Sequence, residues 1–204
     1  MPPTLDPDLS VKPITHLLYL HGFRSSPQST KAQHMAEVMR AFPHVVWSCP
    51  PLPPSPQEAA ALITQLTQDW PDSCAVMGSS LGGFYATWLA NQRPCRLVLI
   101  NPAVDPARDL ARHIGEQTHW HDPSTTFYFA PHYVQELQAL TCGALDDPKR
   151  CLVFIAKGDE VLDWREMHQR YPGAHQVVLE GGDHALSDFA DHVPRVLSFL
   201  GLQP

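Results

Sequence analysis

The sequence has no cluster of basic side chains and no apolar run long enough to cross a bilayer. Its 204 residues carry 14 lysines and arginines against 21 aspartates and glutamates, for a formal net charge of −7. An acidic chain without a basic patch is poorly suited to bind a nucleic-acid backbone or an anionic membrane surface. We therefore expect no nucleic acid and no membrane among its partners.

Cysteine is present only as an odd set of five residues, none of them in a C-x-x-C pair. Cys74, Cys95 and Cys151 begin apolar runs, where a free thiol behaves as a small buried hydrophobe. Free thiols fit a reducing compartment. The amino terminus also lacks the basic start and apolar stretch of a secretory signal. These features predict a cytoplasmic protein.

Two phosphate-binding motifs are also missing, G-x-x-x-x-G-K-[ST] and G-x-G-x-x-G, so no nucleotide cofactor is expected. Hydrophobic residues make up 44% and charged residues 17% of the chain, which is typical of a globular protein. The length suits one well-filled core. We expect one domain over residues 14–204, preceded by a flexible extension at residues 1–13. The sequence gives no indication of oligomeric state.

Apolar runs alternate with segments of helical periodicity along most of the chain. The expected strands cover residues 14–20, 44–49, 74–77, 96–100, 151–156 and 176–179. The expected helices cover residues 29–42, 56–70, 81–91, 164–171 and 193–200, and Ser55-Pro56-Gln57-Glu58 has the pattern of a capped helix start. This alternation predicts an α/β fold with a mostly parallel sheet of about six strands and helices on both faces.

Residues 103–149 form the longest stretch in which no strand is expected. Helices are expected near residues 106–114 and 131–140, and a polar and aromatic run covers residues 118–128. A segment of this length is an excursion over the carboxyl edge of the sheet or a lid over the site.

Ser80 is the candidate nucleophile, because Gly78-Ser79-Ser80-Leu81-Gly82 fits G-x-S-x-G. A buried strand is expected before the motif and a helix after it. Such a turn holds the serine in a strained conformation with its hydroxyl clear of the sheet, and Gly78 and Gly82 permit the backbone to approach closely. The following helix points its positive amino end at the same place.

His184 is the candidate general base. It follows the last expected strand in the run Glu180-Gly181-Gly182-Asp183-His184. In parallel α/β sheets, ligands bind beyond the carboxyl ends of the strands. The order serine, acid, histidine along the chain is that of an α/β-hydrolase.

The acid that orients His184 has several candidates in the sequence. Asp159, Glu160 and Asp163 follow the fifth strand, and Asp105 follows the fourth. Asp159 is preferred because it stands directly after a strand and a permissive glycine, Gly158, whereas Asp163 is placed to cap the helix at 164–171. Asp183, next to the histidine, is expected to point elsewhere.

Two backbone N–H groups are needed to bind the oxyanion of an acyl-transfer intermediate. The sequence offers Leu81, directly after the nucleophile, and Phe23, which follows His21-Gly22 after the first strand. We expect His21 to support that loop rather than take part in chemistry. The run His-Trp-His-Asp at 119–122 suggests a metal, but no third ligand follows at a recognisable spacing, and no metal site is expected.

Five blocks of sequence, taken together, resemble the YqiA-type bacterial esterases of the α/β-hydrolase superfamily. They are Tyr-Leu-His-Gly-Phe-Arg-Ser-Ser-Pro at 19–27, Gly-Ser-Ser-Leu-Gly-Gly-Phe-Tyr-Ala-Thr-Trp at 78–88, Asn-Pro-Ala-Val at 101–104, Gly-Asp-Glu-Val-Leu-Asp at 158–163 and Glu-Gly-Gly-Asp-His-Ala at 180–185. The resemblance implies a cytoplasmic serine esterase for short acyl esters and acyl-CoA thioesters, with Ser80, Asp159 and His184 as its triad. Asp183 departs from the family pattern, in which asparagine is expected.

The expected function is hydrolysis of a small acyl ester through an acyl-serine intermediate. Two alternatives remain open at this point. One is a binding or regulatory protein that keeps the scaffold without turnover, and the other is a perhydrolase or carbon–carbon bond hydrolase on the same scaffold.

Overall fold

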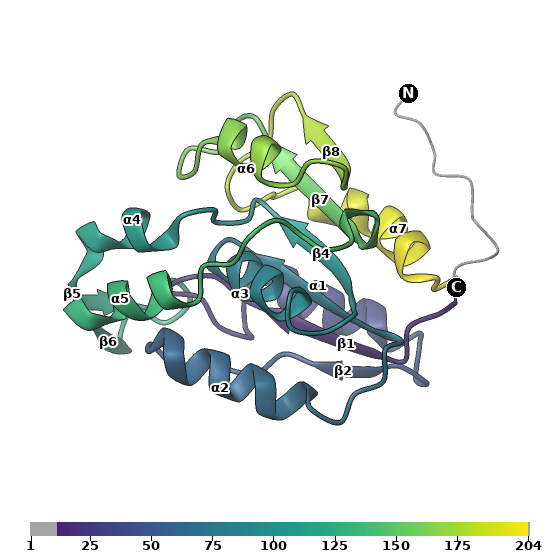
Figure 1. The fold of residues 1–204 in the computed structure, drawn as a ribbon, viewed down its shortest axis with the longest axis horizontal. Coiled ribbons are helices and arrows are strands. Elements are labelled where there is room, and N and C mark those ends of the chain that lie inside the picture. Colours follow the sequence, from purple (N-terminus) through teal and green to yellow (C-terminus); the bar gives the residue numbers. More distant parts are fainter. Residues whose placement is uncertain (1–11, 204) are drawn as a thin grey trace.

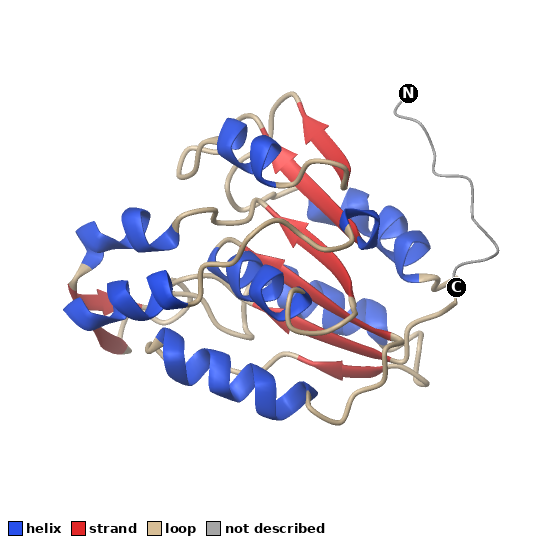
Figure 2. Cartoon of the chain, in the orientation of Figure 1, coloured by secondary structure: helices blue, strands red, loops and turns tan. Residues whose placement is uncertain are grey.

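A computed structural model describes residues 12–203 of the chain, so the extension expected at 1–13 lies almost entirely outside the described residues. Six strands form the main sheet, and every neighbouring pair is parallel (Figure 1, Figure 2). In spatial order they are β2 (Val46–Ser48), β1 (His16–Leu20), β3 (Cys74–Ser79), β4 (Arg96–Ile100), β7 (Cys151–Ala156) and β8 (His175–Leu179). The predicted α/β fold with about six parallel strands is confirmed.

Helices cover both faces of this sheet and enclose two separate cores. One core contains side chains of α1 (Thr30–Met39) and α7 (Phe189–Leu200). The other contains side chains of α2 (Pro56–Thr67), α3 (Leu81–Ala90) and α6 (Trp164–Arg170). Strand β4 serves both cores because alternate side chains of a strand point to opposite faces: Val98 faces the first core and Leu99 the second.

The helix starts expected from capping residues are confirmed. The Ser55 hydroxyl accepts a hydrogen bond of 3.2 Å from the backbone N–H of Glu58, and Pro56 occupies the first turn of α2. The Asp163 carboxylate accepts one of 2.9 Å from the N–H of Arg165 at the start of α6. In both helices a side-chain oxygen satisfies a backbone donor that has no partner within the helix.

The expectation of no strand within residues 103–149 is wrong. An antiparallel hairpin of β5 (Gly115–Thr118) and β6 (Thr126–Phe129) lies between two helical segments. The segments are α4 (Pro106–Leu110), extended by the 3-10 turn η1 (Ala111–His113), and α5 (Pro131–Ala139), followed by η2 (Pro148–Arg150). A hairpin of four-residue strands is marginal by itself. It is stabilised here by Phe127 and Phe129, which pack on the ring of Phe23, and such distant contacts leave little trace in the local pattern.

The last helix also starts earlier than expected, at Phe189 instead of 193. Proline is best tolerated in the first turn of a helix, so Pro194 lies at an unfavourable position inside the longer helix. The buried Phe189 side chain adds apolar contact that favours the longer helix. Among residues 12–203, none of the helices has both the length and the apolar character needed to cross a membrane.

Candidate active site

Ser80 occupies a strained turn between β3 and α3, with φ 55° and ψ −122°. A non-glycine residue in such a region costs on the order of 1–3 kcal/mol, which the surrounding structure must offset. The two motif glycines make the turn possible. A Cβ atom on Gly78 would overlap the backbone of Gly82, and one on Gly82 would overlap the carbonyl of Leu20. The strand, turn and helix expected around Ser80 are therefore present.

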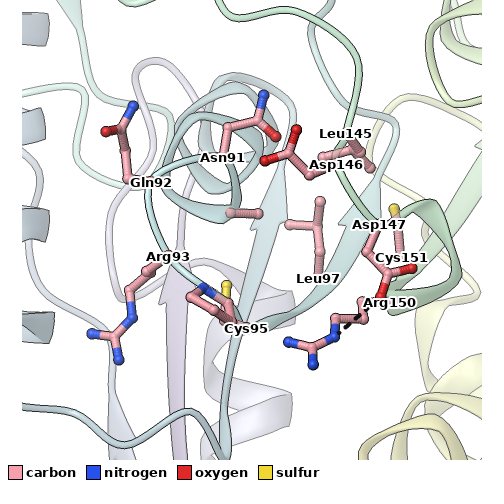
Figure 3. Close-up of a pocket in the computed structure, with 12 residues that line it drawn as sticks. Asn91, Gln92, Arg93, Cys95, Leu97, Leu145, Asp146, Asp147, Arg150 and Cys151 are labelled. Carbon is pink, nitrogen blue, oxygen red and sulfur yellow. Dashed lines mark ion pairs between the residues drawn. The ribbon is translucent and has the colours of Figure 1, made fainter.

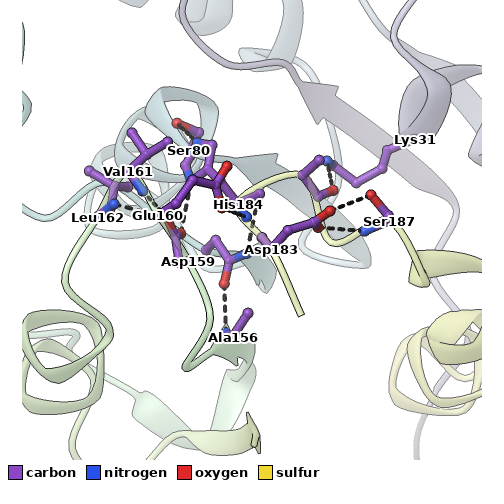
Figure 4. Close-up of polar contacts among 12 residues, drawn as sticks. Lys31, Ser80, Ala156, Asp159, Glu160, Val161, Leu162, Asp183, His184 and Ser187 are labelled. Atoms are coloured by element: carbon purple, nitrogen blue, oxygen red, sulfur yellow. Dashed lines mark hydrogen bonds and ion pairs between the residues drawn. The ribbon is translucent and has the colours of Figure 1, made fainter. Parts of the chain in front are cut away.

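Ser80, His184 and Asp159 form a continuous chain of hydrogen bonds (Figure 4). The Ser80 Oγ lies 3.0 Å from His184 Nε2, and His184 Nδ1 lies 2.8 Å from Asp159 Oδ2. Because an ionised carboxylate can only accept, Nδ1 carries the ring proton and Nε2 is left to accept from the serine hydroxyl. The Asp159 side chain is fully buried, whereas the His184 side chain is 21% exposed. The imidazole is thus held by a buried carboxylate and is partly open to solvent.

The structure distinguishes the four candidate acids. Asp159 Oδ1 accepts from the N–H groups of Val161 and Leu162, both at 2.8 Å, which turns its other oxygen toward the imidazole. The other three carboxylates accept backbone hydrogen bonds instead. Asp163 caps α6, Asp105 caps α4, and Glu160 Oε2 accepts from the backbone N–H of His184 at 3.0 Å.

The Asp183 carboxylate is engaged with Ser187 rather than with the imidazole next to it (Figure 4). It accepts from the backbone N–H of Ser187 at 2.8 Å and from its hydroxyl at 2.6 Å. The Ser187 hydroxyl is the main cause of a lowered Asp183 pKa, and the nearby Lys31 cation also contributes. As expected from the sequence, this side chain points away from the chain of hydrogen bonds.

The loop after β1 lies directly against Ser80. A Cβ atom on Gly22 would be 3.1 Å from the Cβ of Ser80, so Gly22 permits this approach. His21 is buried and supports the loop: the N–H of Leu52 donates to its Nε2 at 3.1 Å, which leaves Nδ1 to donate to the Gly22 carbonyl. Burial lowers the pKa of His21. Phe23 follows this turn, and Leu81 begins α3 on the other side of Ser80.

A family model described as "Uncharacterised protein family (UPF0227)" matches residues 16–201. The chain belongs to this family. The match covers all six strands of the main sheet, so the family resemblance inferred from the five sequence blocks is confirmed.

Solved structures similar to this UPF0227 chain are α/β-hydrolases. Alpha/beta hydrolase domain-containing protein 10 from mouse has a TM-score of 0.69 at 14% identity, with 93% of this chain and 92% of that chain covered. Est1E from Butyrivibrio proteoclasticus, solved with ferulic acid, has a TM-score of 0.69 at 14% identity, with 94% and 90% covered. The esterase domain of a Rhodothermus marinus protein has a TM-score of 0.62 at 20% identity, with 93% and 87% covered. At these identities the likeness establishes the α/β-hydrolase fold.

In residues 119–122 of this UPF0227 chain, the carboxylate of Asp122 has a structural role. Asp122 accepts hydrogen bonds from the hydroxyls of Ser124 and Thr125, at 2.5 Å and 2.6 Å, in the turn between β5 and β6. Within residues 12–203, no three histidine, cysteine, aspartate or glutamate side chains are grouped so that they could hold a metal ion.

A cavity of about 310 Å³ lies at the other end of the sheet, beside the first residues of β4 and β7 (Figure 3). Arg93, Cys95, Asp147 and Arg150 contribute to its lining, and Asp147 forms a 3.3 Å ion pair with Arg150. Ser80 and His184 follow the carboxyl ends of strands, so this cavity is separate from the candidate active site.

Three residues in and around the site were not singled out as supports from the sequence. Glu160 was considered only as an acid, whereas its carboxylate holds the His184 backbone. Arg24 donates from Nε to the Thr118 carbonyl at 2.7 Å. Asn101 belongs to a recognised block, but its side-chain partners lie 55, 82 and 83 residues away. No local pattern reports contacts at such separations.

Proposed function

We propose that this protein is a serine hydrolase that cleaves carboxylic esters through an acyl-serine intermediate. The observation that carries the proposal is the unbroken chain of hydrogen bonds from Ser80 through His184 to Asp159. A hydroxyl becomes nucleophilic when a base takes its proton, and a carboxylate that orients the base also stabilises the imidazolium. The strained turn at Ser80 adds a second, independent feature of such sites.

In the first half of the reaction, Ser80 Oγ attacks the ester carbonyl carbon and its proton passes to His184 Nε2. The carbonyl oxygen becomes an oxyanion, which the backbone N–H groups of Phe23 and Leu81 bind. The tetrahedral intermediate then collapses. The bond to the leaving alcohol breaks as that oxygen takes the proton from Nε2, and the acyl group remains on Ser80.

In the second half, water attacks the acyl-serine carbonyl while His184 Nε2 takes one of its protons. The second oxyanion is bound by the same two N–H groups. Its collapse breaks the bond to Ser80 Oγ, which recovers the proton from Nε2 as the carboxylic acid leaves. Throughout, Asp159 keeps the imidazole in the tautomer that its 2.8 Å contact selects.

The proposed substrates are short-chain acyl esters, with acyl-CoA thioesters as a second class that yields a thiol in place of the alcohol. Support comes from the resemblance of the five sequence blocks to YqiA-type esterases and from similar structures described as esterases, such as the Rhodothermus marinus domain. We also propose a cytoplasmic location, because all five cysteines are free thiols. Residues 103–149 would act as a cap, since Phe127 and Phe129 lie on the ring of Phe23.

Turnover of chromogenic esters of increasing acyl length tests the proposal. Ser80→Ala should lower kcat by on the order of 10⁶-fold, because the nucleophile is removed. The melting temperature should change little, because alanine keeps the backbone turn and only one hydroxyl at a partly exposed position is lost. A fluorophosphonate probe should label the parent protein at Ser80 and leave the variant unlabelled. Parent protein that neither turns over esters nor reacts with the probe would instead favour a binding protein.

A further inference from the structure

Asn101 is a fully buried polar residue that the proposed chemistry does not use. It follows β4 directly, its exposed fraction is 0%, and its φ of 40° lies in the left-handed region. Such a conformation is uncommon for a residue with a side chain, although asparagine tolerates it better than most. A strained, buried residue at a strand end needs compensating contacts.

The side chain of Asn101 supplies three such contacts, and all lead to the candidate active site. Nδ2 donates to the carbonyl of Asp183 at 2.9 Å and to that of His184 at 3.1 Å. Oδ1 accepts from the N–H of Ala156 at 2.8 Å. Ala156 ends β7, and its carbonyl in turn accepts from the N–H of Asp159 at 3.2 Å. One carboxamide therefore joins the histidine loop to the strand that carries the acid.

The same short segment also supports the nucleophile. The backbone N–H of Ser80 donates to the Ile100 carbonyl at 3.0 Å, and the Ser80 carbonyl accepts from the N–H of Ala103 at 3.0 Å. Residues 100–103 thus contact the backbone of the serine turn, while the Asn101 side chain contacts the two other loops. The three loops are far apart in the chain and meet at this segment.

We propose that Asn101 is a positioning residue, which fixes the His184 imidazole relative to Ser80 and Asp159 by binding the backbone of the histidine loop. This inference rests on the proposed function. An asparagine suits the position because its NH₂ group offers two donors for two carbonyls while its oxygen accepts a third bond. A further side-chain hydrogen bond to the backbone of His184 comes from the carboxylate of Glu160, an exposed residue. Buried hydrogen bonds hold geometry more strongly than exposed ones.

Asn101→Asp removes the two N–H donors of the side chain and leaves its shape nearly unchanged. Aspartate has nearly the same shape and keeps an acceptor for Ala156, but its second oxygen would face the carbonyls of Asp183 and His184. We expect kcat for a short-chain ester to fall about 100-fold with KM changed less than threefold, since a displacement of about 1 Å has that effect on a reacting group. Asn101→Gly removes the carboxamide while relieving the positive φ, and should show the same loss of kcat in a well-folded protein.

A second readout does not depend on turnover. The proton on His184 Nδ1, held by Asp159, should give a far-downfield proton NMR resonance in the parent protein. Both Asn101 variants should shift or lose this resonance. Tyr171→Phe is the matched control, because it removes another buried hydrogen bond, 3.0 Å to the Thr87 hydroxyl, away from the site. It should lower the melting temperature while kcat and the resonance stay as in the parent.

Two sets of outcomes separate this inference from the proposed function. Asn101→Asp and Asn101→Gly proteins with kcat within threefold of the parent and an unchanged resonance would overturn the positioning role. Failure of the proposed function would appear differently, as parent protein without Ser80 labelling or ester turnover. In that case the resonance still decides whether Asn101 places His184.

Discussion

At the scale of single residues, Asp159 determines which nitrogen of His184 carries the proton. In Asp159→Asn the amide can donate to Nδ1, which moves the ring proton to Nε2 and leaves no acceptor for the Ser80 hydroxyl. We expect kcat to fall by about 10⁴-fold in assays of a short-chain ester. Asp163→Asn is the control, because asparagine also caps a helix start, and its kcat should stay near the parent value. The opposite ranking would assign the acid to Asp163.

His21 should make stability depend on pH. Burial lowers its pKa below the ordinary value of 6.5, and His119 and His121 add to this effect. Below pH 6.5 the unfolded chain binds a proton at this position that the folded protein does not, so the free energy of unfolding decreases until the folded pKa is reached. His21→Gln, which cannot titrate, should show a smaller decrease in its urea midpoint when the pH is lowered from 7.5 to below 6.5. Parallel curves for variant and parent would contradict this.

At the scale of elements, two helix starts form a natural comparison. Ser55 caps α2 with a side-chain hydrogen bond and donates to Glu136 Oε2 of α5 at 2.7 Å. Ser29 precedes α1 without any capping bond from its hydroxyl. Ser55→Ala should therefore destabilise the protein by about 1–2 kcal/mol, and Ser29→Ala by much less, as measured by urea denaturation. Equal losses of stability would show that the capping hydrogen bond of Ser55 does not contribute to stability.

The β5–β6 hairpin should support, through Arg24, the loop that is proposed to bind the oxyanion. The Arg24 side chain donates to the Thr118 hydroxyl at 2.8 Å and lies over the Trp120 ring. The backbone carbonyl of Arg24 accepts from the backbone N–H of Trp120 at 2.8 Å. Arg24→Asn removes the side-chain contacts at a residue whose φ of 59° asparagine tolerates. We expect kcat to fall about 10-fold, because the adjacent Phe23 N–H is less well held. The exposed Arg40→Asn is the control, and a similar effect there would argue against the coupling.

Sequence periodicity predicted the elements that are stabilised by their own pattern and missed those stabilised by contact. The strands at Arg96–Ile100 and Cys151–Ala156 were predicted to the residue, because a buried central strand is a continuous apolar run. The β5–β6 hairpin depends on Phe23, about a hundred positions earlier. The candidate triad followed from the position of each residue after a strand. The contacts of Asn101 could not be predicted in this way, since they form only when the three loops are already in place.

At the scale of the whole molecule, two cores share one sheet, and this predicts a single cooperative unfolding transition for residues 14–204. Leu99 and Leu152 are both fully buried on neighbouring strands, Leu99 facing the core of α2, α3 and α6 and Leu152 that of α1 and α7. Truncation of either to alanine should cost about 2–5 kcal/mol. Because β4 and β7 contribute side chains to both cores, each variant should lower the urea midpoint. The decrease should be the same by tryptophan fluorescence and by circular dichroism. Transitions that separate in one variant alone would show that the two cores unfold independently, and the chain would then contain more than one folding unit.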